Sequence, residues 1–152
     1  MRATVFLAKQ HCQVQTILMR LEGNPPPPEL ASLLAELATH LAGNLVIEEE
    51  LFHPAVGAEI AVEAAEEHEV AKFALMSLLG TRLDDETFQE KITALKGIVE
   101  QHARAHEEAI SPKVEREMGK EQLEELGQRM KLHFHDVVES GYQAALVRSM
   151  SH

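Results

Sequence analysis

Apolar residues recur in steps of three and four along most of the chain, which is the pattern of helices with one buried face. No segment alternates apolar and polar residues as a half-buried strand would. The periodic segments are joined by short connections, so neighbouring helices should run antiparallel. The pattern predicts an all-α fold, an antiparallel up-down-up-down four-helix bundle with an additional C-terminal helix. The expected helices span residues 3–21, 29–52, 58–79, 85–111 and 120–148.

The expected helix ends follow from glycine and proline. Gly23 should end the first helix, and the four prolines of 25–28 should form an extended connector. His53-Pro54 should end the second helix, because a residue before proline avoids the helical region. Asp84 or Asp85 is a candidate N-cap for the fourth helix, which should kink or stop near Ser111-Pro112. The C-terminal helix contains a possible break near Ser140-Gly141.

Each of the four bundle helices carries polar residues on its apolar face, well inside the helix. They are His11 in the first, Asn44 and Glu48 in the second, His68 in the third, and His102 and His106 in the fourth. In an antiparallel bundle such residues can converge at one level, and imidazoles with a carboxylate suit a first-row transition metal such as iron, zinc or manganese. A single buried histidine is more often a hydrogen-bonded core residue. Glu48 favours a metal, because a carboxylate is rarely buried without a cation or a proton.

Other arrangements of histidine fit less well. His102-x3-His106 has the spacing of a zinc-protease helix but lacks the glutamate that should follow the first histidine. Glu50-x-x-His53 is the one match to a ferritin-like di-iron motif, and it abuts a proline at an expected helix end, so we rejected it. His133 to Glu139 resembles a solvated helix face, and Cys12 is expected to be a small packed residue.

Composition restricts the class of protein. The 152 residues are 45% hydrophobic and 26% charged, as in one soluble globular domain. A formal net charge of −11 argues against binding to nucleic acid or to an anionic membrane. One cysteine permits no internal disulfide, and we found neither a signal peptide nor an apolar run approaching the roughly 18 residues that span a bilayer. These observations predict a cytoplasmic protein.

Two stretches resemble the hemerythrin-like, or HHE cation-binding, family over about residues 5–115. They are Glu48–Pro54, an acidic run followed by Phe-x-Pro, and His102-x3-His106-Glu107-Glu108 with Ser111-Pro112-Lys113. The resemblance implies a four-helix bundle, at residues 1–118, and the apolar spacing after it predicts residues 119–152 to be a C-terminal helix packed on the same domain. It also implies a non-heme di-iron centre with His11, Glu48, His68 and His102 as ligands. The chain departs from the family at Asn44, where a histidine is expected, and at His106, where a bridging glutamate is expected.

The resemblance implies a protein that binds, senses or detoxifies dioxygen, peroxide or nitric oxide. It indicates a metal- and ligand-binding protein more than a classical enzyme, with peroxide scavenging left open. With these two departures, the centre is either a di-iron centre, which we favour, or a single ion bound by Glu48, His68, His102 and His106. Iron is the expected metal, ahead of zinc and manganese. The alternative is a degenerate bundle, with a mononuclear or absent metal, that acts as a structural or interaction module.

Overall fold

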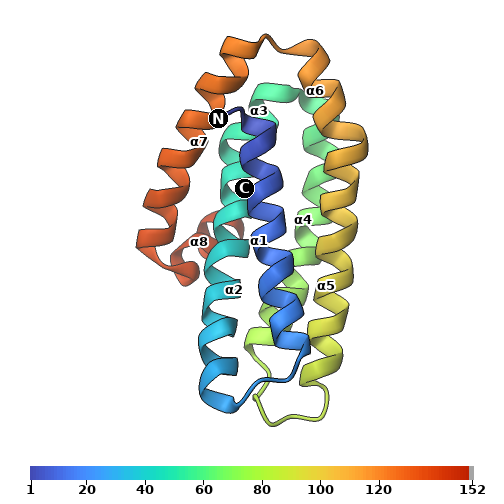
Figure 1. The fold of residues 1–152 in the computed structure, drawn as a ribbon, viewed down its shortest axis with the longest axis vertical. Coiled ribbons are helices and arrows are strands. Elements are labelled where there is room, and N and C mark those ends of the chain that lie inside the picture. The colour runs from blue at the N-terminus through green and yellow to red at the C-terminus, as the bar shows by residue number, and fades with distance from the viewer. Residues whose placement is uncertain (151–152) are drawn as a thin grey trace.

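The fold is an antiparallel bundle of four long helices, described by a computed structural model over residues 1–150 (Figure 1). They are α1 (Ala3–Glu22), α2 (Pro27–Ile47), α4 (Ala58–Leu79) and α5 (Phe88–Ala105). No strand occurs among the described residues. The predicted all-α bundle is confirmed, and α4 has the predicted bounds. Each helix places its apolar stripe toward the bundle axis, as the three-and-four spacing requires.

Two of the long helices continue past the prolines that were expected to end or kink them. α2 runs into a π-helical turn, η1 (Glu48–Phe52), and then α3 (His53–Val56); α5 runs into η2 (His106–Ile110) and α6 (Ser111–Glu117). In each case the proline is the second residue after the π-turn, where a missing N–H costs little. The prediction that the second helix ends at His53-Pro54 was therefore wrong. It ends at Gly57, whose φ of 123° suits glycine.

The start of α5 also differs from the prediction. Neither Asp84 nor Asp85 is its N-cap, because the residue before the helix is Thr87. Asp85 instead accepts hydrogen bonds from the backbone N–H of Thr87, at 2.8 Å, and from its hydroxyl, at 2.7 Å. The aspartate therefore stabilises the turn that leads into α5, two residues earlier than a cap would.

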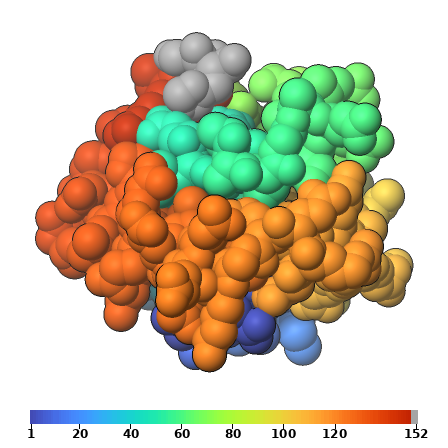
Figure 2. Space-filling model, turned by 90° about the horizontal axis from the view of Figure 1, so that it is seen from above, coloured from blue at the N-terminus to red at the C-terminus, as the bar shows by residue number. Residues whose placement is uncertain are grey.

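The C-terminal region forms two helices, α7 (Lys120–Ser140) and α8 (Tyr142–Met150), separated at Gly141, whose φ is 91°. The predicted break near Ser140-Gly141 is confirmed. α7 packs on α1 and α2, and α8 packs on α2. The ring of Phe134 explains Gly43 inside α2, since a Cβ at residue 43 would lie 2.9 Å from the Cε2 of Phe134. Seen from the end that holds α3, the chain around α3, α6 and the start of α7 closes over the bundle (Figure 2).

The buried apolar residues form two clusters, and the polar residues of interest lie between them. One cluster fills the bundle around α2, from Val14 on α1 to Val99 on α5, and the other lies around Leu7, Phe52 and Val114. His11 on α1, His68 on α4 and His102 on α5 fall between the residues of the two clusters, and Glu48 lies next to the point in α2 where one cluster gives way to the other. The site is therefore held at a fixed depth by apolar packing on both sides.

The continuous helix Pro27–Val56 is apolar enough to cross a membrane by length and composition, with a mean hydropathy of 1.5 over 18 residues. It is the one such helix within residues 1–150. The sequence analysis expected no apolar run of nearly 18 residues, and this helix reaches that length because a few polar residues lie within it. In the structure, 61% of that window is buried inside the bundle. Its apolar character is accounted for by the core that it forms.

Candidate metal centre

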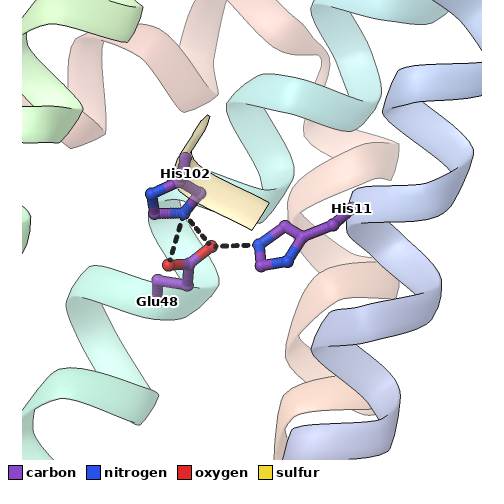
Figure 3. A group of neighbouring side chains, drawn as sticks. All are labelled: His11, Glu48 and His102. Atoms are coloured by element: carbon purple, nitrogen blue, oxygen red, sulfur yellow. Dashed lines mark hydrogen bonds and ion pairs between the residues drawn. The ribbon is translucent and has the colours of Figure 1, made fainter. Parts of the chain in front are cut away.

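Glu48 lies at the centre of the site, and its side chain is completely buried. His11 and His102 point toward its carboxylate from α1 and α5 (Figure 3). The Nε2 atom of His11 lies 3.2 Å from Oε2, and that of His102 lies 3.1 Å from Oε1 and 3.4 Å from Oε2. Residues far apart in sequence thus meet at one carboxylate.

Three further imidazoles surround the same carboxylate. The Nε2 atoms of His53, His68 and His106 lie 3.7, 3.4 and 3.0 Å from Oε1 of Glu48. All three side chains are buried, yet none of these nitrogens has a hydrogen-bond partner among the described residues. A buried polar atom without a partner is unfavourable, and several that converge on one carboxylate fit the donor set of a metal ion.

His53 is the site residue that sequence reasoning missed. In a regular α-helix, a residue five positions after Glu48 would project about 140° away from it around the axis. In the π-turn η1, the backbone N–H of His53 bonds to the carbonyl oxygen of Glu48, five residues earlier, so the two residues stack. The available signal is the histidine itself, in Glu50-x-x-His53, and the expected helix end at Pro54 hides it.

Asn44 is buried near the same site, one helical turn before Glu48. Its Nδ2 atom has no hydrogen-bond partner in the described chain. It lines a cavity of about 220 Å³ together with His11, His68 and His102. The rest of that cavity is mainly apolar, with Val14, Leu41, Leu45, Ala71 and Val99 in its lining. One side of the site therefore faces a largely apolar cavity between the helices, and His53 and His106 are not part of its lining.

The outward-facing nitrogens of two histidines are held by carboxylates. Nδ1 of His68 lies 2.9 Å from Oε1 of Glu49, and Nδ1 of His102 lies 3.0 Å from Oε2 of Glu67. A carboxylate can only accept, so each Nδ1 carries a proton. In histidine ligands such outer partners fix the ring and direct the other nitrogen toward the metal.

The electrostatics of the site follow from one carboxylate among several imidazoles. Burial raises the pKa of Glu48, but the charge and hydrogen bond of His102 outweigh it and hold that pKa well below its ordinary value. Burial lowers the pKa of His102, yet Glu48 and Glu67 bind its two ring nitrogens and raise it to about 10. For His106, burial dominates and lowers the pKa. Without a metal, the site therefore holds a buried ion pair of Glu48 with His102.

We expect the metal-free protein to lose stability as pH rises from about 6.5 toward about 10. In this window the folded protein keeps the proton on His102, whose pKa is about 10, whereas the unfolded chain, with an ordinary value of 6.5, has lost it. His102 by itself should lower the free energy of unfolding by at most about 1.4 kcal/mol per pH unit. His68 adds to this slope, because burial, which lowers its pKa, is outweighed by the carboxylates of Glu48 and Glu49, which raise that pKa above the ordinary value. Urea unfolding of chelator-treated protein, from neutral to alkaline pH, measures this slope. His102→Asn should flatten it, and an equal slope in both proteins would contradict the prediction.

Residues outside the site behave differently from their predictions in two cases. His133 is only partly exposed, at 25%, and its Nε2 atom lies 2.8 Å from Oε1 of Glu50, in the π-turn. Cys12 is exposed, so the expectation of a packed residue was wrong. His135 pairs with Glu139 on the surface, as expected of a solvated helix face. None of the three contributes to the cluster around Glu48.

The chain matches the family of the hemerythrin HHE cation binding domain over residues 3–114. The protein therefore belongs to this family of metal-binding helical bundles, as the sequence motifs predicted. It is also similar to a hemerythrin HHE cation binding domain-containing protein from Mycobacterium kansasii, known from a crystal structure. The two are 25% identical, with a TM-score of 0.84 over 98% of this chain and 99% of the other. A search of curated proteins found no match.

Proposed function

We propose that Glu48 bridges two metal ions. The observation that carries this proposal is that two groups of possible ligands, His11 with His102 and His53 with His68, each include Glu48 and share no other residue. Within each group, the ligand atoms lie within 4.8 Å of one another, close enough to bind one ion. A carboxylate has two oxygens and can serve both ions, which an imidazole cannot do.

The two ions would have unequal surroundings. Oε1 of Glu48 has His53, His68 and His106 around it, whereas Oε2 has His11. His102 lies near both oxygens. In this arrangement His53 supplies the imidazole that the second helix lacks at residue 44. The predicted ligand set of His11, Glu48, His68, His102 and His106 is thereby extended by one residue, and Asn44 is left beside the cavity.

We propose iron as the metal. Imidazole and carboxylate donors suit iron, zinc and manganese alike, and the di-iron centre implied by the family resemblance favours iron. Iron would supply one-electron chemistry with oxygen species, which zinc does not. The residues of this chain would hold the ions, keep His68 and His102 in one tautomer through Glu49 and Glu67, and exclude bulk water.

The ligand that we propose is dioxygen, a peroxide or nitric oxide. Oε2 of Glu48 has fewer imidazoles around it than Oε1 does. His11, which lies beside Oε2, lines the cavity together with Asn44, as do His68 and His102. An ion there would keep a coordination position open, as reactive metal sites require. The apolar lining favours a small neutral molecule. The Nδ2 atom of Asn44 is a free donor in that lining, and it could bind the ligand once it arrives.

Elemental analysis and absorption spectroscopy test the proposal. After purification from iron-supplemented cells, we expect two iron ions per chain. We also expect the visible spectrum of the reduced protein to change on addition of dioxygen, hydrogen peroxide or nitric oxide. One ion per chain would contradict the bridging role of Glu48. Two ions with an unchanged spectrum would contradict ligand binding at the metal, and absence of metal would contradict both.

A further inference from the structure

The last helix, α8, reaches back to the residue that follows Glu48. Ser149, on α8, is completely buried. Its hydroxyl donates to the carboxylate of Glu49, with Oγ 3.0 Å from Oε1 and 2.8 Å from Oε2. Its carbonyl oxygen accepts a hydrogen bond from Nζ of Lys72 at 3.0 Å, and the same Nζ lies 2.9 Å from Oε1 of Glu49. Glu49 is thus held from α8 and from α4 together.

This contact continues to an imidazole of the metal centre. Oε1 of Glu49 lies 2.9 Å from Nδ1 of His68, whose Nε2 faces Glu48 at 3.4 Å. The side chains of Glu49 and His68 are 9% and 1% exposed, so water offers little competition for either. The position of the Glu49 carboxylate therefore determines how the His68 ring is turned.

The outer ring nitrogen of His102 is also bound by a carboxylate, but that carboxylate is more exposed than Glu49. It belongs to Glu67, whose side chain is 46% exposed. On the α8 side, by contrast, the next carboxylate is held too: Arg148 donates to both oxygens of Glu50, through Nε at 2.6 Å to Oε2 and through a second nitrogen to Oε1. α8 thus contacts both carboxylates that follow Glu48 in the π-turn. It also lies outside residues 3–114, which match the HHE domain.

We propose that α8 is a positioning element of the metal centre, and that Ser149, with Lys72, holds Glu49 so that His68 presents Nε2 to the metal. This inference rests on the proposed function, because it takes His68 as a ligand. Loss of an outer partner of a histidine ligand typically weakens metal affinity about 10–100-fold. Ser149 acts one step further out, through Glu49, so a smaller effect of roughly threefold to tenfold is expected from its removal.

The test compares Ser149→Ala with Ser149→Thr in the full chain, with Co²⁺ as the probe. The alanine variant should bind Co²⁺ more weakly in competition with a chelator and should shift the visible d–d absorption, which reports ligand geometry. The threonine variant keeps the hydroxyl and should restore both. Ser32→Ala, on the exposed face of α2, is the matched control and should change neither.

A melting temperature that falls in Ser149→Ala while Co²⁺ affinity and spectrum stay unchanged would show a purely structural role and overturn the inference. If the unaltered protein binds no Co²⁺, the proposed function fails by itself. The positioning is then measured on the metal-free protein by ¹⁵N NMR of His68 at alkaline pH. The proton should reside on Nδ1 in the unaltered protein and distribute over both nitrogens in Ser149→Ala. The same tautomer in both would again overturn the inference.

Discussion

Glu48→Gln is expected to reduce the metal content from two ions per chain to near zero. The substitution keeps the size of the side chain and removes the charge that both groups of ligands share. A neutral amide is a weak ligand for iron, and it cannot offer two equivalent anionic oxygens. Glu48 is completely buried among five histidines, so no water-exposed acid can take its place. Elemental analysis measures the loss directly.

A second measurement separates loss of metal from loss of fold. Iron should raise the melting temperature of the unaltered protein, because a ligand that binds only the folded state stabilises it. Iron should leave the melting temperature of Glu48→Gln unchanged. Circular dichroism should show the same helix content in both proteins. Glu66→Gln, an exposed change of the same kind on α4, is the control and should keep two ions. Two ions retained in Glu48→Gln would mean that Glu48 is not the bridge.

His53→Gln is expected to leave about one tightly bound ion per chain, the one held by His11 and His102. His53 lies on the Oε1 side of Glu48, in the group that it forms with His68. Loss of an outer partner alone lowers metal affinity about 10–100-fold, so loss of a direct ligand should cost at least as much. Titration with iron under anaerobic conditions, followed by elemental analysis, gives the stoichiometry and the two affinities.

This second prediction distinguishes the ligand set implied by the family from the one that the geometry supports. The ligand set implied by the family does not include His53, so under that set its replacement should remove no ion. Asn44→Ala should leave both ions in place, because Asn44 faces the cavity. His135→Gln, at an exposed histidine of α7, is the matched control. If His53→Gln binds iron with unchanged stoichiometry and affinity, His53 is not a ligand and does not replace the histidine that the family has at the position of Asn44.

The four bundle helices and the depth of the site could be predicted from the sequence. A helix of 3.6 residues per turn converts spacings of three and four into a single face, so an apolar stripe specifies which side is buried. The same geometry places His11, Glu48, His68, His102 and His106 on those buried faces. Local spacing alone therefore predicted that these side chains would face the bundle interior. In the structure the four histidines surround the carboxylate of Glu48.

The helix ends next to the prolines could not be predicted in the same way. Glu48–Phe52 and His106–Ile110 contain good helix formers, and nothing in their composition distinguishes a π-turn from an α-helical turn. Both π-turns do precede a proline at the same spacing, but proline was expected to end a helix, not to follow a wider turn within one. The π-turn η1 turned His53 toward Glu48, and the two turns carried the chain past Pro54 and Pro112.

By itself, the sequence determined the class of fold and five of the six His and Glu side chains at the centre, because each depends on periodicity within one helix. The family followed from the motif resemblance at Glu48–Pro54 and His102–Lys113. Only the tertiary structure decided the sixth, His53, and the support of Glu49 by Ser149. The physical reason is sequence distance: the Ser149–Glu49 contact joins residues 100 positions apart. The position of His53 depends on the π-turn η1, which brings residues five apart onto one face of the helix. Neither leaves a periodic pattern in the chain.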